Sequence, residues 1–364
     1  MALPSMRGVQ CSESMLVRSG QKERMTVGVI GERYNPISYL MLSQLLTSDE
    51  IQVSFFIDGS LPKRHKEKLY GKGFNYGKAV GFWIALKRRL VERLPHRLDC
   101  LDLIAKCDHK VTFIVPQNAS INTGLPAKMY NEPLVDYLLV AGCDQLLKEC
   151  VLRLARKKAI NYHYSLLPSY RGKFPVFWQW FNREPFIGYT FHEIDLGIDT
   201  GAPLYQGCVS YDPSQPHTEA QRKVVEESSQ VVVEMLRCVR AGRVRLHSEK
   251  VPESYYHSEK YHALITIDEA KTRKEVGEVI RRLGFVRLKN GLEVKELVGT
   301  GDERITGYRI DKDGIAVPVR DGYVKVRPAS TERRYRIKKL VLGKRLIKGM
   351  RPEAETRSKS ASTS

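Results

Sequence analysis

The chain has no uninterrupted apolar run of about 18 residues, the length that a membrane-spanning helix needs. Cysteine is scarce, with seven in 364 residues and no Cys-x-x-Cys pair among them. A small, odd and scattered set argues against a disulfide framework or a structural zinc site, and it favours a reducing compartment. We therefore expect no membrane span, no bound metal and a cytoplasmic location.

Nucleotide-binding motifs are missing as well. Gly28 and Gly31 lie at the first predicted strand, but the Gly-x-Gly-x-x-Gly spacing of a dinucleotide site is absent. The chain also lacks the Gly-x4-Gly-Lys-Ser/Thr pattern of a phosphate-binding loop. The sequence gives no support for ATP or NAD binding.

Positive charge is the strongest bias in the composition. The formal net charge is +19, and residues 61–100 carry eleven Lys and Arg against three acids, while residues 320–351 carry twelve against two. Such concentration favours an anionic partner, for example a tRNA or a nucleotide-linked sugar. A solvated basic surface explains the same numbers equally well.

Strand and helix patterns alternate at the start of the chain. Residues 26–30 and 53–57 predict buried strands around a helix at 38–46, and further buried strands are predicted at 109–115 and 135–141. This order predicts an α/β fold, doubly wound around a mostly parallel, Rossmann-like sheet.

Composition also suggests where domains begin and end. Short alternating segments separated by Asp-Gly turns predict a small β domain in the last third of the chain. We expect a disordered N-terminal extension at 1–24, with an organelle-targeting segment as the alternative, a catalytic domain at 25–240, a linker at 241–260, the β domain at 261–350 and a disordered tail at 351–364.

Polar side chains follow two predicted strands in the middle of the chain. After a basic, helix-like run at 152–158, residues 159–163 predict a short strand that points Asn161 and His163 to the same face. A strand at 187–194 then leads into a loop with two carboxylates. An amide and an imidazole can hold a developing oxyanion, and a carboxylate can orient the imidazole or take a proton from an attacking amine. The pattern predicts acyl-transfer chemistry.

The motif Asn-x-His-x-Ser-Leu-Leu-Pro-x-x-Arg-Gly at 161–172, followed by Asp-x-Gly-Ile-Asp-Thr-Gly at 195–201, resembles the signature of the 10-formyltetrahydrofolate-dependent formyltransferases. The resemblance implies transfer of a formyl group from 10-formyltetrahydrofolate to a primary amine. It implies that Asn161, His163 and Asp199 are catalytic, with Asp195 as the rival carboxylate. The folate would be bound by Gly142, Asp144, Ser165, Leu166, Leu167, Pro168 and Asp195, and the acceptor by Arg171 and Gly172.

Different segments of the sequence point to different acceptor amines. The aromatic run at 174–178 and the strand at 191–195 are more similar to formyltransferases that act on nucleotide-linked amino sugars or other small metabolites, and we expect such an acceptor. The basic segments favour methionyl-tRNA instead, as does an ending similar to the OB-like C-terminal domain of methionyl-tRNA formyltransferases.

Three further expectations concern single residues or the reaction as a whole. A basic loop with Lys63 and Arg64 follows the second strand and is predicted to reach toward the acceptor. His192 is interpreted as a structural histidine. A catalytically retired protein that binds RNA or another partner is the remaining alternative.

Overall fold

The computed structural model describes residues 24–60, 98–108, 110–248, 251–289, 292–311 and 313–328. Residues 1–23 of the extension predicted at 1–24, the tail at 351–364 and the two basic-loop residues Lys63 and Arg64 lie outside the described residues.

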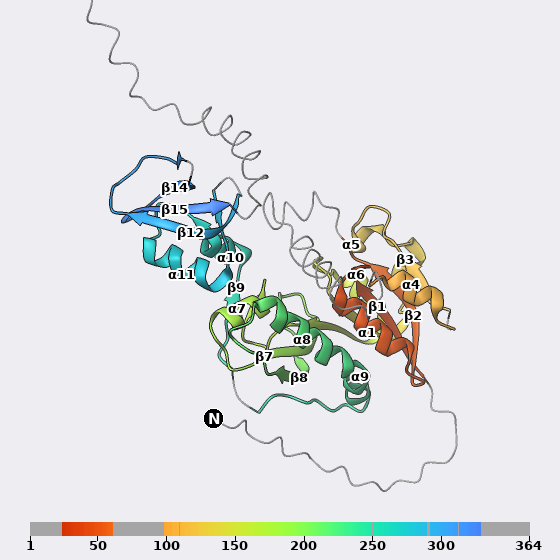
Figure 1. The fold of residues 1–364 in the computed structure, drawn as a ribbon. Helices are drawn as coiled ribbons and strands as arrows, with labels where there is room; N and C mark the ends of the chain where they lie inside the picture. Colours follow the sequence, from red (N-terminus) through yellow and green to blue (C-terminus); the bar gives the residue numbers. More distant parts are fainter. Residues whose placement is uncertain are drawn as a thin grey trace, which may run out of the picture.

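A seven-stranded sheet with the order β3-β2-β1-β4-β5-β7-β8 forms the centre of the larger domain (Figure 1). Five strands run parallel: β1 (Met25–Gly31), β2 (Ile51–Asp58), β3 (Thr112–Ile114), β4 (Val135–Ala141) and β5 (Ala155–His163). The last two, β7 (Ile187–Glu193) and β8 (Pro203–Val209), continue the sheet antiparallel. The predicted doubly wound, mostly parallel α/β fold is confirmed.

Helices cover both faces of this sheet, and successive residues of β4 show why. Tyr137 and Leu139 belong to the larger apolar core, whereas Leu138 and Val140 belong to the smaller one. The larger core is covered by α1 (Pro36–Leu46), α4 (Cys100–Lys106), α7 (Pro175–Phe181), α8 (His217–Gln230) and α9 (Val232–Arg240). The smaller core is covered by α5 (Ile121–Gly124), the 3-10 turn η1 (Ala127–Tyr130) and α6 (Glu149–Leu152).

The sequence of α1 shows how local signals and burial agree. Asn35 caps the helix, because its Oδ1 accepts a hydrogen bond from the backbone N–H of Ile37 at 3.1 Å. Pro36 follows at the first helical position, where no backbone N–H is needed. Met41 and Leu45 then recur on the buried face at helical spacing.

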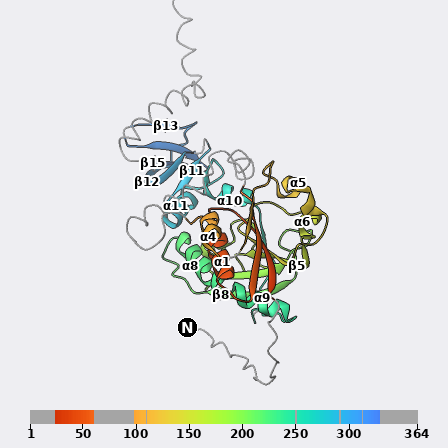
Figure 2. The same ribbon diagram turned by 90° about the vertical axis from the view of Figure 1, so that its right-hand side faces the viewer.

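A second sheet forms a smaller C-terminal domain (Figures 1 and 2). Its strand order is β10-β11-β12-β15-β14-β13, comprising β10 (Thr266–Ile267), β11 (Val286–Leu288), β12 (Glu293–Gly301), β13 (Arg309–Ile310), β14 (Ile315–Val319) and β15 (Gly322–Pro328). Helix α11 (Arg273–Leu283) packs against it. The small β domain is confirmed, while its OB-like character stays a prediction because the predicted domain extends beyond the described residues.

A short connection joins the two domains. β9 (Tyr255–Tyr256) pairs in parallel with β6 (Arg171–Gly172), which lies inside the sequence motif at 161–172, and α10 (Ser258–Ile265) begins soon after β9. The Tyr261 ring of α10 packs against Phe174 and Phe177 at centroid distances of 4.5 and 4.8 Å. The segment between the domains therefore contacts the loop that follows β5.

Candidate active site

The register between β5 and β7 gathers four polar side chains on one face of the sheet. Asn161 lies opposite His192, and His163 lies opposite Thr190. Residues that face each other across antiparallel strands point to the same side of the sheet. His163, Thr190 and His192 are all buried there.

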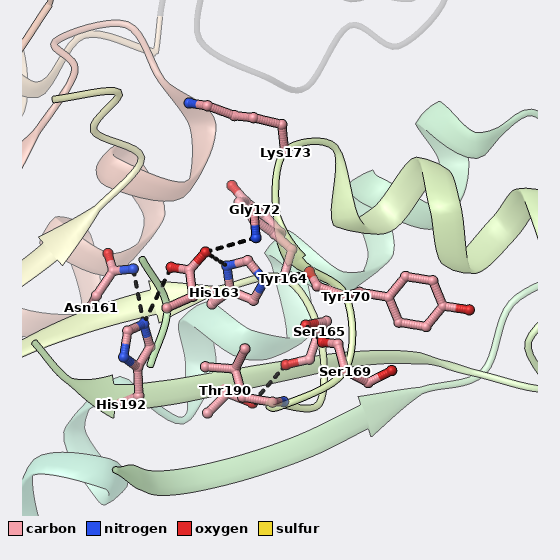
Figure 3. A network of polar contacts seen from close by, with 12 residues as sticks. Asn161, His163, Tyr164, Ser165, Ser169, Tyr170, Gly172, Lys173, Thr190 and His192 are labelled. Carbon is pink, nitrogen blue, oxygen red and sulfur yellow. Dashed lines mark hydrogen bonds and ion pairs between the residues drawn. The ribbon is translucent and has the colours of Figure 1, made fainter. Parts of the chain in front are cut away.

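His192 is the hydrogen-bond partner of Asn161 (Figure 3). The Nδ1 atom of His192 lies 2.9 Å from the carbonyl oxygen of Glu193, and because a carbonyl only accepts, Nδ1 carries the ring proton. Nε2 is then free to accept from the Asn161 amide at 3.1 Å. Burial, followed by the nearby charge of His163, lowers the pKa of His192, which keeps this ring neutral.

The His163 ring has the opposite tautomer. Its Nε2 lies 3.0 Å from the carbonyl oxygen of Tyr170 and therefore donates, which leaves Nδ1 facing Asp199. Nδ1 and Oδ2 of Asp199 are 3.5 Å apart. The carboxylate of Asp199 is therefore the group that faces the second ring nitrogen of His163.

Asp199 reaches the two imidazoles from the loop between β7 and β8. Its backbone is left-handed, with a φ of +52°, and its Oδ2 accepts a hydrogen bond from the N–H of Gly172 at 2.9 Å. Its Oδ1 lies 3.7 Å from Nε2 of His192. The structure thus brings Asn161, His163 and Asp199 together, with His192 between the amide and the carboxylate.

The rival carboxylate, Asp195, occupies a different position. It is exposed, and its Oδ1 accepts hydrogen bonds from the N–H of Gly197 at 3.0 Å and from the hydroxyl of Thr200 at 2.7 Å. These bonds shape the turn that carries Asp199. Asp195 is therefore placed to support the loop, whereas Asp199 is placed to contact the imidazoles.

The predicted folate residues at 165–168 form a tightly bonded loop beneath the two histidines. Thr190 donates its hydroxyl to the carbonyl of Ser165 at 2.6 Å and accepts from the N–H of Leu167 at 3.0 Å. Leu166 and Leu167 are buried, and the Leu167–Pro168 bond is cis. Ser165, Leu166 and Leu167 thus face the interior of the protein, whereas Pro168 is exposed.

The loop after β4 faces the loop after β6. Gly142 has a φ of +73°, and Asp144 follows it with Oδ1 3.6 Å from the Nζ of Lys173. The Lys173 side chain extends above Asn161 and His163 in Figure 3. Asp144 thus lies within reach of Lys173, the residue that follows Gly172.

The predicted acceptor residues divide into three groups. Gly172 contributes its backbone N–H to Asp199, as described above. Arg171 forms an ion pair with Glu253 at 2.5 Å, so its guanidinium is directed toward the interdomain segment. Lys63 and Arg64 lie outside the described residues.

The structure places His192, which the sequence predicts to be structural, next to Asn161. The sequence places it on the strand before Asp199, but its partnership with Asn161 depends on the register between two strands that are 31 positions apart. Its position three residues before Asp195, on a predicted buried strand, was the available signal.

Two kinds of feature are absent from the described ranges. No group of three or more His, Cys, Asp or Glu side chains within those ranges could hold a metal ion. None of the helices in the same ranges has both the length and the apolar character needed to cross a membrane.

Comparisons with known proteins agree on one family. Residues 119–236, which include the residues gathered above, match the formyl transferase family. The methionyl-tRNA formyltransferase of Thermotoga maritima is 29% identical over 228 residues, covering 60% of this chain and 72% of the relative. That of a Synechococcus strain is 32% identical over 134 residues, covering 34% of this chain and 42% of the relative. A solved N-formyltransferase from Helicobacter canadensis has a TM-score of 0.48 at 16% identity, covering 84% of this chain and 99% of that one.

Proposed function

We propose that this chain is a member of the formyltransferase family and that it transfers a formyl group from 10-formyltetrahydrofolate to the primary amine of an acceptor. The observation that carries the proposal is the convergence of Asn161, His163 and Asp199 on one buried face of the sheet. Formyl transfer forms a bond between the acceptor nitrogen and the formyl carbon and breaks the bond from that carbon to N10 of the folate. The formyl oxygen bears negative charge in between, and one proton moves from the acceptor nitrogen to N10.

The groups at the site fit the formyl donor. A developing oxyanion needs hydrogen-bond donors, and Asn161 supplies an amide N–H group on the same face of the sheet as the His163 imidazole. A proton transfer needs a base beside the same carbon, and Asp199 is mostly buried, with 14% of its side chain exposed. The chain thus provides both kinds of group, and 10-formyltetrahydrofolate would supply the activated formyl group.

In this proposal, Asn161 donates to the formyl oxygen as it becomes an anion. The amide has two N–H groups, so one can remain on His192 while the other turns to the oxyanion. His192 accepts from Asn161 only while it is neutral, which is the state that its lowered pKa favours. The role of His192 is therefore to fix the orientation of the amide.

Asp199 and His163 act together on the proton. Nε2 of His163 is engaged by the Tyr170 carbonyl, so Nδ1 is the ring nitrogen that can exchange a proton on the side of Asp199. The pair takes a proton from the attacking amine and returns one to the departing N10, directly or through one water. No net proton is gained or lost by the protein.

For the acceptor we favour methionyl-tRNA. Support comes from the relatives named above, of which the Thermotoga maritima protein is matched over 72% of its length, and from the net charge of +19. The sequence favoured a nucleotide-linked amino sugar because the segments at 174–178 and 191–195 are more similar to formyltransferases that act on such acceptors. Phe177, Trp178 and Trp180 are buried in the larger core, so their rings are not available to stack on a nucleotide base.

The experiment is a comparison of acceptors. The purified protein is incubated with 10-formyltetrahydrofolate and methionyl-tRNA, uncharged tRNA or a nucleotide-linked amino sugar, and the release of tetrahydrofolate is measured. We expect turnover with methionyl-tRNA, none with uncharged tRNA, and a KM for the charged tRNA that rises steeply as salt increases. Turnover with the amino sugar alone would reassign the acceptor, and RNA binding without any folate release would support a retired enzyme.

A further inference from the structure

The loop that follows the cis proline has four consecutive backbone N–H groups with defined partners. The N–H groups of residues 170 and 171 donate to the hydroxyl and the carbonyl of Ser254, at 2.7 and 2.9 Å. That of Gly172 donates to Asp199, and that of Lys173 donates to the carbonyl of Tyr256 at 2.9 Å. Three of the four are therefore held by residues 254–256, and the fourth holds the catalytic carboxylate.

The peptide group between residues 170 and 171 is fixed at both ends. Its N–H donates to the carbonyl of Ser254, while its C=O accepts from Nε2 of His163 at 3.0 Å. The position of this carbonyl determines which nitrogen of His163 carries the proton. The contact made by Ser254 is thus one peptide group away from the catalytic imidazole.

The backbone of the loop also needs external support. Tyr170 has a φ of +58°, in the left-handed region that side chains other than glycine rarely adopt, and Gly172 has a φ of +93°. Such backbone conformations persist where several surrounding contacts hold them in place. Besides the hydrogen bonds, the Tyr170 ring stacks on Tyr256 at 5.3 Å with an interplanar angle of 10°.

We propose that residues 254–256, which lie after the matched family region at 119–236, form a positioning clamp for the catalytic pair, and that Ser254 is its central residue. The clamp holds the Tyr170 carbonyl against His163 and the Gly172 N–H against Asp199. α10 follows the clamp in the sequence and packs on Phe174 through Tyr261. The C-terminal domain is therefore connected to the C-terminal end of the clamp. This inference rests on the proposed function, since it assigns a positioning role to residues of that same site.

The hydroxyl of Ser254 offers a specific test, because it is the side-chain group in the clamp that bonds the loop backbone. In Ser254→Ala the N–H of Tyr170 loses its acceptor in a half-buried position, while the backbone contacts of the segment remain possible. Ser254→Thr restores the hydroxyl. Ser258→Ala, four residues further on, removes a serine hydroxyl from the first turn of α10 and serves as the matched control.

The first measurement is made without substrates. Imidazole ¹⁵N resonances report which ring nitrogen is protonated, and we expect the Nε2-protonated fraction of His163 to fall in Ser254→Ala. The resonances of His192 should not change, since its carbonyl partner, Glu193, belongs to the sheet. Amide exchange at Tyr170 should accelerate at least tenfold in Ser254→Ala and remain as in the wild type in Ser254→Thr and Ser258→Ala.

The second measurement is the rate of formyl transfer. We expect Ser254→Ala to lower kcat about tenfold without changing the KM for the folate, because the clamp acts on geometry at the reacting groups. If Ser254→Ala does not fold, Ser254→Cys, whose thiol is a weak acceptor, should give smaller changes in the same direction. Unchanged His163 resonances, together with a kcat within twofold of the wild type, would overturn the clamp. A wild-type protein without turnover would instead refute the proposed function, while the resonance comparison still decides the clamp.

Discussion

Asp199 places its Oδ2 3.5 Å from Nδ1 of His163, the ring nitrogen that does not face the backbone carbonyl of Tyr170. The imidazole is therefore held from one side by a neutral acceptor and from the other by a carboxylate. This arrangement makes the negative charge of Asp199, and not merely its hydrogen-bonding capacity, the property on which the proposed proton transfer depends.

Asp199→Asn tests that dependence. The amide oxygen can still accept from the N–H of Gly172, but the charge beside His163 is lost, so we expect kcat for formyl transfer to fall about 10²–10⁴-fold with little change in KM. Steady-state kinetics with 10-formyltetrahydrofolate measure the effect. Asp212→Asn, an exposed carboxylate that bonds Ser214 in a turn, is the control. Retention of more than a tenth of the wild-type kcat in Asp199→Asn would argue against the mechanism.

Asn161 and His192 form the second testable pair. We expect Asn161→Ala to reduce kcat about 10²–10³-fold, as for the loss of one oxyanion donor, and His192→Phe to reduce it about tenfold by releasing the amide. If His192 acts through Asn161, the double variant should be no slower than Asn161→Ala alone. Multiplicative losses in the double variant would show that His192 contributes independently.

Burial of a histidine in α8 predicts a pH-dependent stability. His217 packs against the rings of Phe177 and Trp180, and burial lowers its pKa to about 4. Because the unfolded state binds this proton at its ordinary pKa near 6.5, the contribution of neutral His217 is complete above that pH and is lost as pH falls toward about 4. We expect the free energy of unfolding to decline over this window by on the order of 2 kcal/mol.

Denaturant unfolding between pH 7 and pH 4 measures this decline. His217→Phe, which removes the titrating group but keeps an aromatic ring, should show a shallower decline than the wild type. His257→Phe provides a control at an exposed histidine next to α10. An identical pH dependence in His217→Phe and the wild type would exclude His217 as the source.

Alanine substitution at two glycines is expected to change the stability of the protein in opposite directions. A Cβ added at Gly201 would lie 1.7 Å from the carbonyl oxygen of Glu193, so Gly201→Ala must displace the loop that carries Asp199. We expect a loss of about 1–3 kcal/mol in unfolding free energy and a reduced kcat. Gly277→Ala lies in the middle of α11, where the new Cβ would be 3.5 Å from Leu297, and should stabilise the protein by about 0.5–1 kcal/mol. Thermal unfolding of both variants measures the two opposite effects.

The sequence was sufficient for the parts of the fold that local pattern controls. The buried strand at 135–141 begins and ends where the structure has it, because apolar runs in a parallel sheet are buried on both faces. The basic run at 152–158 was misread as helix-like, since residues from Ala155 onward belong to β5. There Lys157 and Lys158 form ion pairs with Asp136 and Glu193 on the two neighbouring strands, which charge pattern alone cannot reveal.

At the site, too, some features follow from the local sequence and others from contacts between distant segments. Side-chain alternation was enough to place Asn161 and His163 on one face. The contacts of His192 and Ser254 depend on strand register and on a crossing segment more than 80 positions away, and neither leaves a local pattern in the sequence.

The antiparallel pairing of β7 with β5 has one remaining consequence. β7 ends beside Ile160, so the connection to β8 must travel back along the sheet before its carboxylate meets His163. The number of residues in that connection therefore determines where the Asp199 carboxylate lies relative to His163. One inserted residue would advance the chain by about 3.3 Å, enough to carry the carboxylate past its target while leaving every strand in place.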